Sequence, residues 1–365
     1  MSDTISIGRQ GWIGIAFETS AGTGGTNPVK TIPYTTNSLH NVVEVIDDEA
    51  AKGIRERAWG SVAARTRGEG DISINVDAEN LPYILIPALG TCMTQSEGSG
   101  VYQHVITRKS GNPPTTTCIT INDTVETRRY TYAVSNTLEL TFSDGLITAT
   151  AGILSKAPEA STETMDAVTE ERILAFKDAN IYFGDTMAEA EHSAATETGA
   201  TGLTAFTITI NNNAEAQYES GSSSPAQISL GQFEVGGNYT LFFENSTERA
   251  ALEASPATTR AMCIVLIGDV IGSYTEKIQI TIPQFHLTDR GVDTAPAGFV
   301  TENPTFVGDY DSTNGSIIVK VWNETDTTCY TCCTASTSSS SSSSSSFSSS
   351  SSSFSSSSSS SSTST

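Results

Sequence analysis

Two stretches of this chain share one order of features, and this repetition is the strongest constraint on its fold. Residues 68–90 read GEGDISINVDAENLPYILIPALG, and residues 234–254 read EVGGNYTLFFENSTERAALEA. Each contains a glycine, a strand-like stretch, a polar junction and a helix. Gly70 and Gly237 precede the two strands, so the offset between the copies is 237 − 70 = 167. The pattern favours a duplicated unit; the alternative is a chance recurrence, because the identity is low.

The remaining text is typical of short β-strands. Segments such as ISINV, TLELTF, FTITI and SIIVKVW alternate polar and apolar residues or run apolar, and Gly, Asn, Asp and Ser separate them. Convincing helical text is confined to residues 79–89 and 246–254, where Ser246 can act as N-cap. The predicted fold class is therefore all-β with a few short helices.

The repeat and the composition divide the 365 residues into four parts, and this length suits two domains. The predicted first domain spans 1–155 and the second 170–326. Residues 156–169 are polar and aperiodic, as expected of a linker. Residues 327–365 form a cysteine-containing, serine-rich tail.

The serine-rich tail is predicted to be flexible or displayed externally. From about residue 334 it carries no charge and almost no apolar side chains. Such a segment cannot bury enough surface to offset the entropy lost on ordering. Two readings of its role stay open: Phe347 and Phe354 could anchor it to neighbouring subunits, or the serines could carry O-linked glycans.

The six cysteines fall into two groups. Three stand alone in apolar text, which predicts buried free thiols: Cys92, Cys118 and Cys263. The motif CYTCC contains the other three: Cys329, Cys332 and Cys333. Three readings of this motif stay open, namely a local or interchain disulfide, a soft metal ion and no role, although a tetrahedral metal site would lack a fourth ligand.

No catalytic motif is recognisable in the sequence. The four histidines are scattered outside any H-E-x-x-H pattern. No serine lies in a G-x-S-x-G elbow, and the glycine-rich SAGTGGTN is not followed by G-K-[ST]. We therefore expect no enzyme, no cofactor and no metal site, although paired carboxylates of a carbohydrate-active enzyme stay an open alternative.

The chain is strongly acidic, with 41 Asp and Glu against 19 Lys and Arg and a net charge of −22. This balance argues against a site that grips nucleic-acid phosphates, but it is compatible with a surface that repels them. The N-terminus lacks a signal-peptide pattern, and no apolar run approaches the ~20 residues that span a bilayer. We expect synthesis in a host cytoplasm and no membrane insertion.

Several stretches resemble the major tail tube proteins of long-tailed bacteriophages. INNNAEAQYESGSSSPAQISLGQFEVGGNYTLFFEN, residues 210–245, has the family's strand, Asn-rich turn, polar arm and G-x-x-x-V-x-G before a Phe-rich strand. GRQGWIGIAFETSAGTGGTNP and RRYTYAVSNTLELTFSDGLITATAGIL resemble other parts of the same family. The resemblance covers roughly residues 8–323, and the cysteine- and serine-rich end falls outside it.

The resemblance implies two tandem β-sandwich or barrel-like tube domains, each with a flanking helix. Six such domains usually form a ring, so a two-domain chain implies a trimer, and rings stack into a tube in the virion tail. The implied partners are further copies of the chain, the tape measure, terminator and baseplate proteins, and DNA in passage. The alternatives are another ring-forming virion protein, such as a terminator or baseplate hub, and an extracellular adhesin or surface-layer protein.

Alternation along the strands predicts which charges line the channel of such a tube. In 71–77, Ile72, Ile74 and Val76 share one face, and the polar residues share the other. An acidic wall would let DNA slide, because Lys and Arg would hold its phosphates. The lumen candidates are Asp71, Asp77, Glu139 and Glu244; the alternative is that they are solvated residues of an outer face.

Two long polar arms, 49–60 and 216–228, are candidates for contact with the next ring. Loops of this length would otherwise be mobile. Arg55 and Arg57 in the first arm could meet acidic residues across the ring junction, and Glu219 and Ser223 are the candidates in the second arm.

Overall fold

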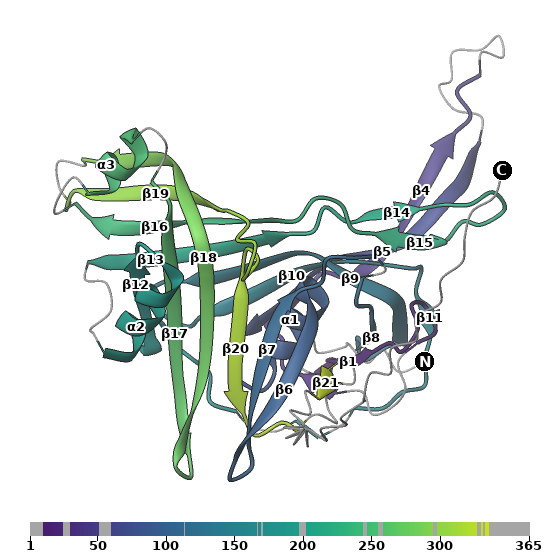
Figure 1. Cartoon of the computed structure of the whole chain (residues 1–365). Coiled ribbons are helices and arrows are strands. Elements are labelled where there is room, and N and C mark those ends of the chain that lie inside the picture. The colour runs from purple at the N-terminus through teal and green to yellow at the C-terminus, as the bar shows by residue number, and fades with distance from the viewer. Residues whose placement is uncertain are drawn as a thin grey trace, which may run out of the picture. The chain divides into compact units, whose positions relative to one another are not determined.

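The computed structural model of this chain describes residues 10–24, 30–50, 60–112, 114–165, 167–168, 171–196, 202–243, 247–254, 258–294, 298–326, 330 and 333–335. Strands dominate these residues, so the all-β prediction is confirmed (Figure 1). The helices are α1 (Leu81–Leu89), η2 (Phe176–Asp178), α2 (Met187–Thr196) and α3 (Thr247–Glu253). The first-half strands are β1 (Trp12–Phe17), β2 (Lys30–Ile32), β3 (Thr36–Asn37), β4 (His40–Asp47), β5 (Ser61–Asn75), β6 (Gly90–Gly98), β7 (Val101–Arg108), β8 (Thr117–Asn122), β9 (Thr127–Phe142), β10 (Thr148–Ser155) and β11 (Glu159–Ala160). The second-half strands are β12 (Ala179–Gly184), β13 (Leu203–Asn211), β14 (Glu215–Gln217), β15 (Gln227–Ser229), β16 (Glu234–Phe242), β17 (Arg260–Ile271), β18 (Tyr274–Asp293), β19 (Thr301–Gly308), β20 (Ile318–Asn323) and β21 (Cys333–Ala335).

Eight strands pair side by side and antiparallel, and we call them the main sheet. Their order is β4, β5, β10, β9, β13, β16, β19, β18. In Figure 1, β9, β10, β13 and β16 run next to one another across the molecule. The first four strands come from the first half of the chain and the last four from the second half, so the sheet consists of two four-stranded units joined edge to edge.

The two faces of the main sheet differ because side chains alternate along each strand. Paired positions on one face are mostly apolar and buried, as in the row Ile74, Ala149, Leu140, Ile208, Gly237 and Phe306, in which only Gly237 is half-buried. Helix α1, whose residues are all buried, packs on β9. The hydrophobic core therefore lies on this side, and the opposite face is polar.

The two four-stranded units share an irregularity at the same place. Asn136 is left unpaired where β9 meets β10, and Thr288 is left unpaired where β18 meets β19. Each is a β-bulge, an extra residue that bends one strand. The offset between the bulges is 288 − 136 = 152, and the offset between the opposing Gly152 and Thr305 is 305 − 152 = 153.

The glycines that open the repeated strands also make the same contact. A Cβ on Gly70 would overlap the carbonyl oxygen of Ser38, and a Cβ on Gly237 would overlap that of Thr207. In both units the neighbouring backbone approaches so closely that only glycine fits. The offset between Ser38 and Thr207 is 207 − 38 = 169.

Strands from the two predicted domains pair with one another, and the division into two domains stays a prediction. The second-half strand β20 lies between β18 and the first-half strand β7, and β9 pairs with β13. Phe142 and Phe206 stack edge to face across the second junction at 5.7 Å. A further layer, β2–β1–β8–β9–β11, belongs to the first half.

The ends of the predicted parts also differ from the structure. Tyr330 is completely buried and β21 pairs with β6, so the body extends to Ala335 rather than ending at 326. The predicted linker lies against the first half, where β11 pairs with β9 and Glu163 contacts Arg129. Both segments are held by strand pairing and by side-chain contacts, which composition does not reveal.

Candidate assembly interface

The junction between the two units is a complete interface within one chain. Residues 137–142 of β9 pair with residues 206–211 of β13. Next to it, the buried Asn212 side chain donates hydrogen bonds of 2.9 Å to the carbonyl oxygens of Ala88 and Ser135. Asn212 thereby ties the second unit to α1 and β9 of the first. Asn212 lies in the Asn-rich turn of the sequence, but no sequence pattern predicted its role.

The main sheet ends in two edges. β4 and β3 pair only with β5 among the described residues, and β3 keeps the register of β4. At the other end of the sheet, residues 286–293 of β18 pair with β19 and with no other strand that the structure describes. Rows of backbone N–H and C=O groups at such edges are ready to pair with another chain.

The second arm, which we define as residues 214–230 including β14 and β15, folds onto the first unit. Ile228 is only 1% exposed and packs with Tyr132, Val134 and Leu154. The Thr66 N–H donates to the carbonyl oxygen of Ser223 at 2.7 Å. The arm that contains the predicted contact residues Glu219 and Ser223 is thus held by its own chain, and Glu219 stays exposed.

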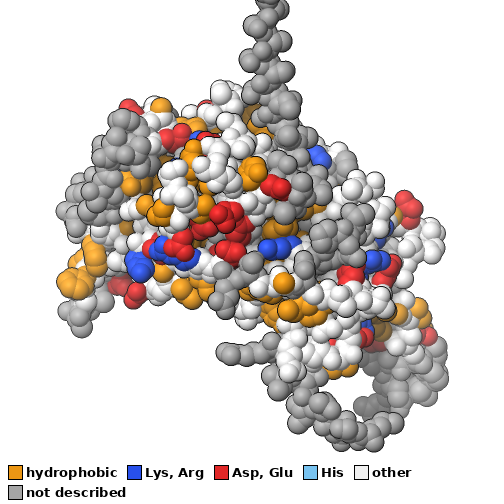
Figure 2. Space-filling view, turned by 90° about the horizontal axis from the view of Figure 1, so that it is seen from below, with side chains coloured by type: hydrophobic (Ala, Val, Ile, Leu, Met, Phe, Trp, Pro, Cys, Tyr) orange, Lys and Arg blue, Asp and Glu red, His pale blue; other side chains and the backbone are white. Residues whose placement is uncertain are grey.

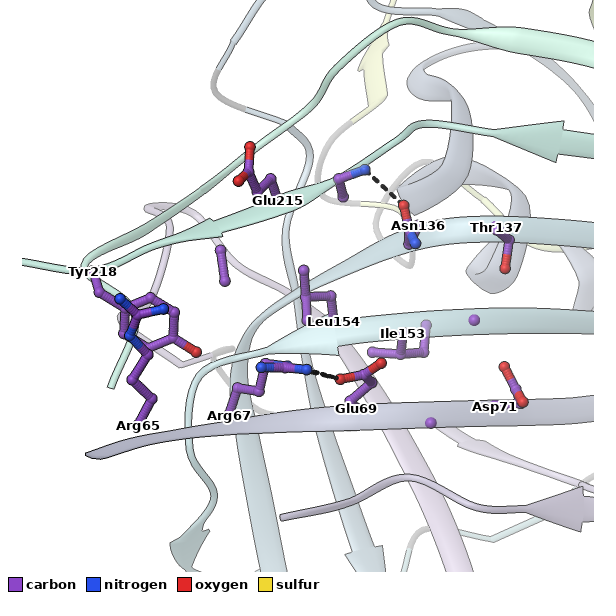
Figure 3. Close-up of a pocket in the computed structure, with 14 residues that line it drawn as sticks. Arg65, Arg67, Glu69, Asp71, Asn136, Thr137, Ile153, Leu154, Glu215 and Tyr218 are labelled. Atoms are coloured by element: carbon purple, nitrogen blue, oxygen red, sulfur yellow. Dashed lines mark hydrogen bonds and ion pairs between the residues drawn. The ribbon is translucent and has the colours of Figure 1, made fainter. Parts of the chain in front are cut away.

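A cleft of about 440 Å³ lies between the second arm and strands β5, β10 and β9. Figure 3 shows Arg65 over the ring of Tyr218, at 4.8 Å from its centroid, and Arg67 paired with Glu69 at 2.7 Å. On the far side, Asn136 accepts a hydrogen bond of 2.6 Å from the Ala214 N–H. The lining is charged and polar, and its groups mostly bind one another, as expected of an interface between two elements.

The first arm, which we define as the described residues 40–50 and 60–67 of the β4–β5 hairpin, extends away from the body (Figure 1). Its apolar side chains are uncovered, between 42% and 69% exposed: Val43, Val45, Ile46 and Val62. The second arm has its apolar side chains covered by the first unit. Among the described residues, the two arms therefore differ in whether their apolar side chains are covered.

The polar face of the main sheet carries one row of polar residues across seven strands. Backbone pairing joins Asn75, Thr148, Thr141, Thr207, Asn238, Thr305 and Asp289. Glu139 lies two residues before Thr141 in β9, on the same face, and pairs with Thr150 and Thr209. Asp71 pairs with Gly152. Two of the predicted lumen residues, Asp71 and Glu139, thus lie on this face and are exposed. Asp289 is a further acidic residue that the sequence analysis missed.

Asp77 does not lie on that face, and its prediction as a lumen residue is corrected. It is 5% exposed, and its carboxylate accepts hydrogen bonds from the N–H groups of Glu79 and Asn80 and from the Asn80 amide. Burial raises the pKa of Asp77, although these bonds oppose the shift. The strand ends at Asn75, so Asp77 closes the turn into α1 instead of continuing the alternation.

The other predicted site residues fall outside the described residues or are only partly covered by them. Glu244, Arg55, Arg57, Cys329 and Cys332 lie outside the described part, and of Cys333 only its place in β21 is described. The lone cysteines Cys92, Cys118 and Cys263 are buried, as predicted.

Acidic side chains gather in the middle of one face of the molecule, whereas Lys and Arg lie there in smaller groups (Figure 2). Burial raises the pKa of Glu276 to about 7, and the charges of Glu79, Glu171 and Asp269 add to the shift. In the part of the chain that the structure covers, no group of His, Cys, Asp and Glu is arranged to hold a metal ion.

The model of the phage tail tube protein family matches residues 8–317. No curated protein matches the chain. None of the helices among the described residues is long and apolar enough to cross a bilayer.

Proposed function

The chain belongs to the phage tail tube protein family, and from this we propose that its copies close into rings that stack into an acidic-walled conduit for DNA. As a member of this family it is a structural component of the virion tail and not an enzyme. Its family also implies self-assembly alongside other tail proteins. The ring, its symmetry and the passage of DNA are the proposed part.

The junction between β9 and β13 carries the proposal. It joins one four-stranded unit to the next within a chain, and each end of the main sheet has the corresponding edge free among the described residues. Repeating the junction between copies would place β18 of one copy beside β3 and β4 of the next. Each chain supplies two units, so three copies would supply the six units of a ring.

The repeated features also give the register of this contact. The bulges show that a residue of β9 corresponds to the residue of β18 that lies 152 positions later. The glycine contacts show that a residue of β3 or β4 corresponds to the residue of β13 that lies 169 positions later. Thr137 pairs with Asn211 at the junction within the chain. The corresponding pair between copies is Asp289 and Val42, since 137 + 152 = 289 and 211 − 169 = 42.

The polar face of the main sheet would line the channel of such a ring. Its threonines and asparagines bind water, and Asp71, Glu139 and Asp289 add negative charge without a neighbouring cation in the row described above. Such a wall would repel DNA phosphates rather than release their counterions and hold them. The opposite face is committed to the core, which supports this orientation.

The first arm would then lie on the neighbouring copy. Within the chain, the second arm covers Tyr132, Val134 and Leu154 of the preceding unit. By repetition, the first arm of one copy would cover the second unit of the copy before it, which would bury Val43, Val45, Ile46 and Val62. The described parts of both arms would then make contacts within a ring. Contact with the next ring stays a prediction for residues 51–59, which lie outside the part of the chain that the structure covers.

A disulfide between copies tests the ring. A chain that carries Val42→Cys and Asp289→Cys should form interchain disulfides on assembly and run as linked dimers and trimers on a denaturing gel. Ile46→Cys with Asp289→Cys is the matched control, because it is about four positions out of register, or about 13 Å along the strand. The unsubstituted chain measures background from the native cysteines. Equal crosslinking of both pairs would contradict the register, and assembled tubes without any crosslink would contradict the edge contact.

A further inference from the structure

In the first unit, Leu174 forms backbone hydrogen bonds with the ends of two strand segments of the main sheet. Leu174 itself comes from the start of the second half of the chain. Its N–H donates to the carbonyl oxygen of Val76 at 2.8 Å, and its carbonyl accepts the N–H of Ile147 at 3.1 Å. The Val76 N–H in turn donates to the Ile147 carbonyl at 2.9 Å. Leu174 is 1% exposed and belongs to the core. One residue thus satisfies two backbone groups and seals the strand ends.

The second unit has the same strand end without the sealing residue. The positions that correspond to Val76 and Ile147 are Phe243 and Val300, since 76 + 167 = 243 and 147 + 153 = 300. The Phe243 N–H donates to the Val300 carbonyl at 2.9 Å, which repeats the bond of the first unit. Within the described residues, no backbone bond reaches the Phe243 carbonyl or the Val300 N–H.

Apolar side chains surround this unfilled position and are open to solvent. Phe242, Phe243 and Val300 are between 39% and 41% exposed, and Phe299 is 82% exposed, whereas Val76 and Ile147 of the first unit are fully buried. Phe242 and Phe299 pack edge to face at 5.6 Å. We call these four residues of the second unit, Phe242, Phe243, Phe299 and Val300, the open slot. It fits an extended segment that offers one N–H, one C=O and an apolar side chain, as in β-strand addition.

We propose that Ile7 of the next copy in the ring fills the open slot, as Leu174 fills the corresponding position within the chain. This inference rests on the proposed ring. Leu174 precedes the second half and covers the unit before it, so in a ring the segment that precedes the first half would cover the second unit of the neighbouring copy. The offset of the repeat selects the residue, since 174 − 167 = 7, and Ile7 lies in the apolar text TISI.

The spacing along the chain and the position of the described N-terminal end agree with this contact. Strands β1 and β12 have equal length, and their first residues are 179 − 12 = 167 positions apart, which is the offset of the repeat. Their pairing differs, because β1 pairs with β8 and β12 pairs with β17. Trp12 lines a cavity with Thr36 and Asn37 of β3, the edge assigned to the neighbour's β18. β18 ends beside Thr301, next to the slot. Ile7 and Trp12 are 12 − 7 = 5 residues apart, and an extended chain spans ~3.3 Å per residue, so Ile7 can lie up to about 16 Å from Trp12.

Crosslinking tests the occupant directly. Full-length chain with Ile7→Cys and Phe299→Cys should form disulfides between copies in assembled material and not in the dissociated chain. The control is Ile7→Cys with Val125→Cys, which is 80% exposed but lies in the turn between β8 and β9. A disulfide within one chain, or assembled tubes that never crosslink, would overturn the proposal.

The two proposals fail in different ways. If the pair at 42 and 289 crosslinks and the pair at 7 and 299 does not, the slot assignment is wrong and the ring stands. If neither pair crosslinks in assembled tubes, both are wrong.

Hydrogen exchange gives a second readout that a folding defect would not mimic. On assembly, the amide of Val300 should exchange at least about tenfold more slowly, because it gains a buried acceptor. Ile7→Asp should abolish this protection and Ile7→Leu should keep it. Equal protection in both variants would contradict a side chain at position 7 in the slot.

Discussion

Gly237 and Gly70 are each pressed against the backbone of the neighbouring strand, so added atoms there must displace it. Gly237→Ala is expected to lower the free energy of unfolding by about 1–3 kcal/mol, the usual cost of overpacking. Gly111→Ala is the control, because a Cβ there meets nothing within 4 Å. Denaturant unfolding measures both variants, and an unchanged midpoint for Gly237→Ala would contradict the close approach.

Glu276 is expected to make stability fall as pH rises. Its pKa is about 7 in the folded chain, raised from 4.5 mainly by burial. Between these two values the folded chain binds more protons than the unfolded chain, so its stabilising effect is lost as pH rises through about 7. Glu276→Gln should flatten this slope in thermal unfolding of the unassembled chain, and Glu215→Gln, at an exposed position of β14, should not. An unchanged slope for Glu276→Gln would contradict a shifted pKa.

The two arms are expected to respond differently to loss of an apolar side chain. Ile228→Ala should loosen the second arm in the isolated chain, at a cost of up to about 2–5 kcal/mol for a buried isoleucine. Ile46→Ala should change that stability by less than about 0.5 kcal/mol, because Ile46 is exposed, yet it should weaken assembly. Limited proteolysis of the second arm and the concentration needed for assembly separate the two effects. If Ile46→Ala destabilised the isolated chain and Ile228→Ala did not, the proposed contacts of the two arms would be contradicted.

Local sequence patterns predicted where the strands lie better than they predicted which segments of the chain those strands contact. Alternation placed Ile72, Ile74 and Val76 correctly in the core, because each strand position depends only on its neighbours. It failed at Asp77, where the chain leaves the strand to start a helix. The contact of the second arm with Tyr132 joins residues distant in the chain, and no local pattern encodes it.

Across the whole chain, the division after Ala335 gives a further prediction. Deleting residues 336–365 should leave stability and assembly unchanged. Deleting residues 330–365 should cost about 3–5 kcal/mol, because Tyr330 is buried against Tyr83 and His104 and donates to the Glu79 carbonyl oxygen. Equal stability of the two truncated chains would contradict the assignment of Tyr330 to the core.

The sequence predicts two tandem domains, and strands from the two halves of the chain pair within one sheet. Sequence alone cannot tell whether an unpaired strand edge meets its partner in the same chain or in another copy, because the pairing groups are backbone N–H and C=O in both cases. The β9–β13 junction is the pairing within the chain. The matching edges of β4 and β18 are the reason to expect the same pairing between copies.

Electron microscopy of the assembled material at a resolution that separates strands tests the ring most directly. The predicted result is three chains in each ring, with residues 286–293 of every copy beside β3 and β4 of the next and the row of Asn75, Thr141 and Asp289 facing the channel. Six chains in each ring, or β18 edges that contact no β3 or β4, would contradict it.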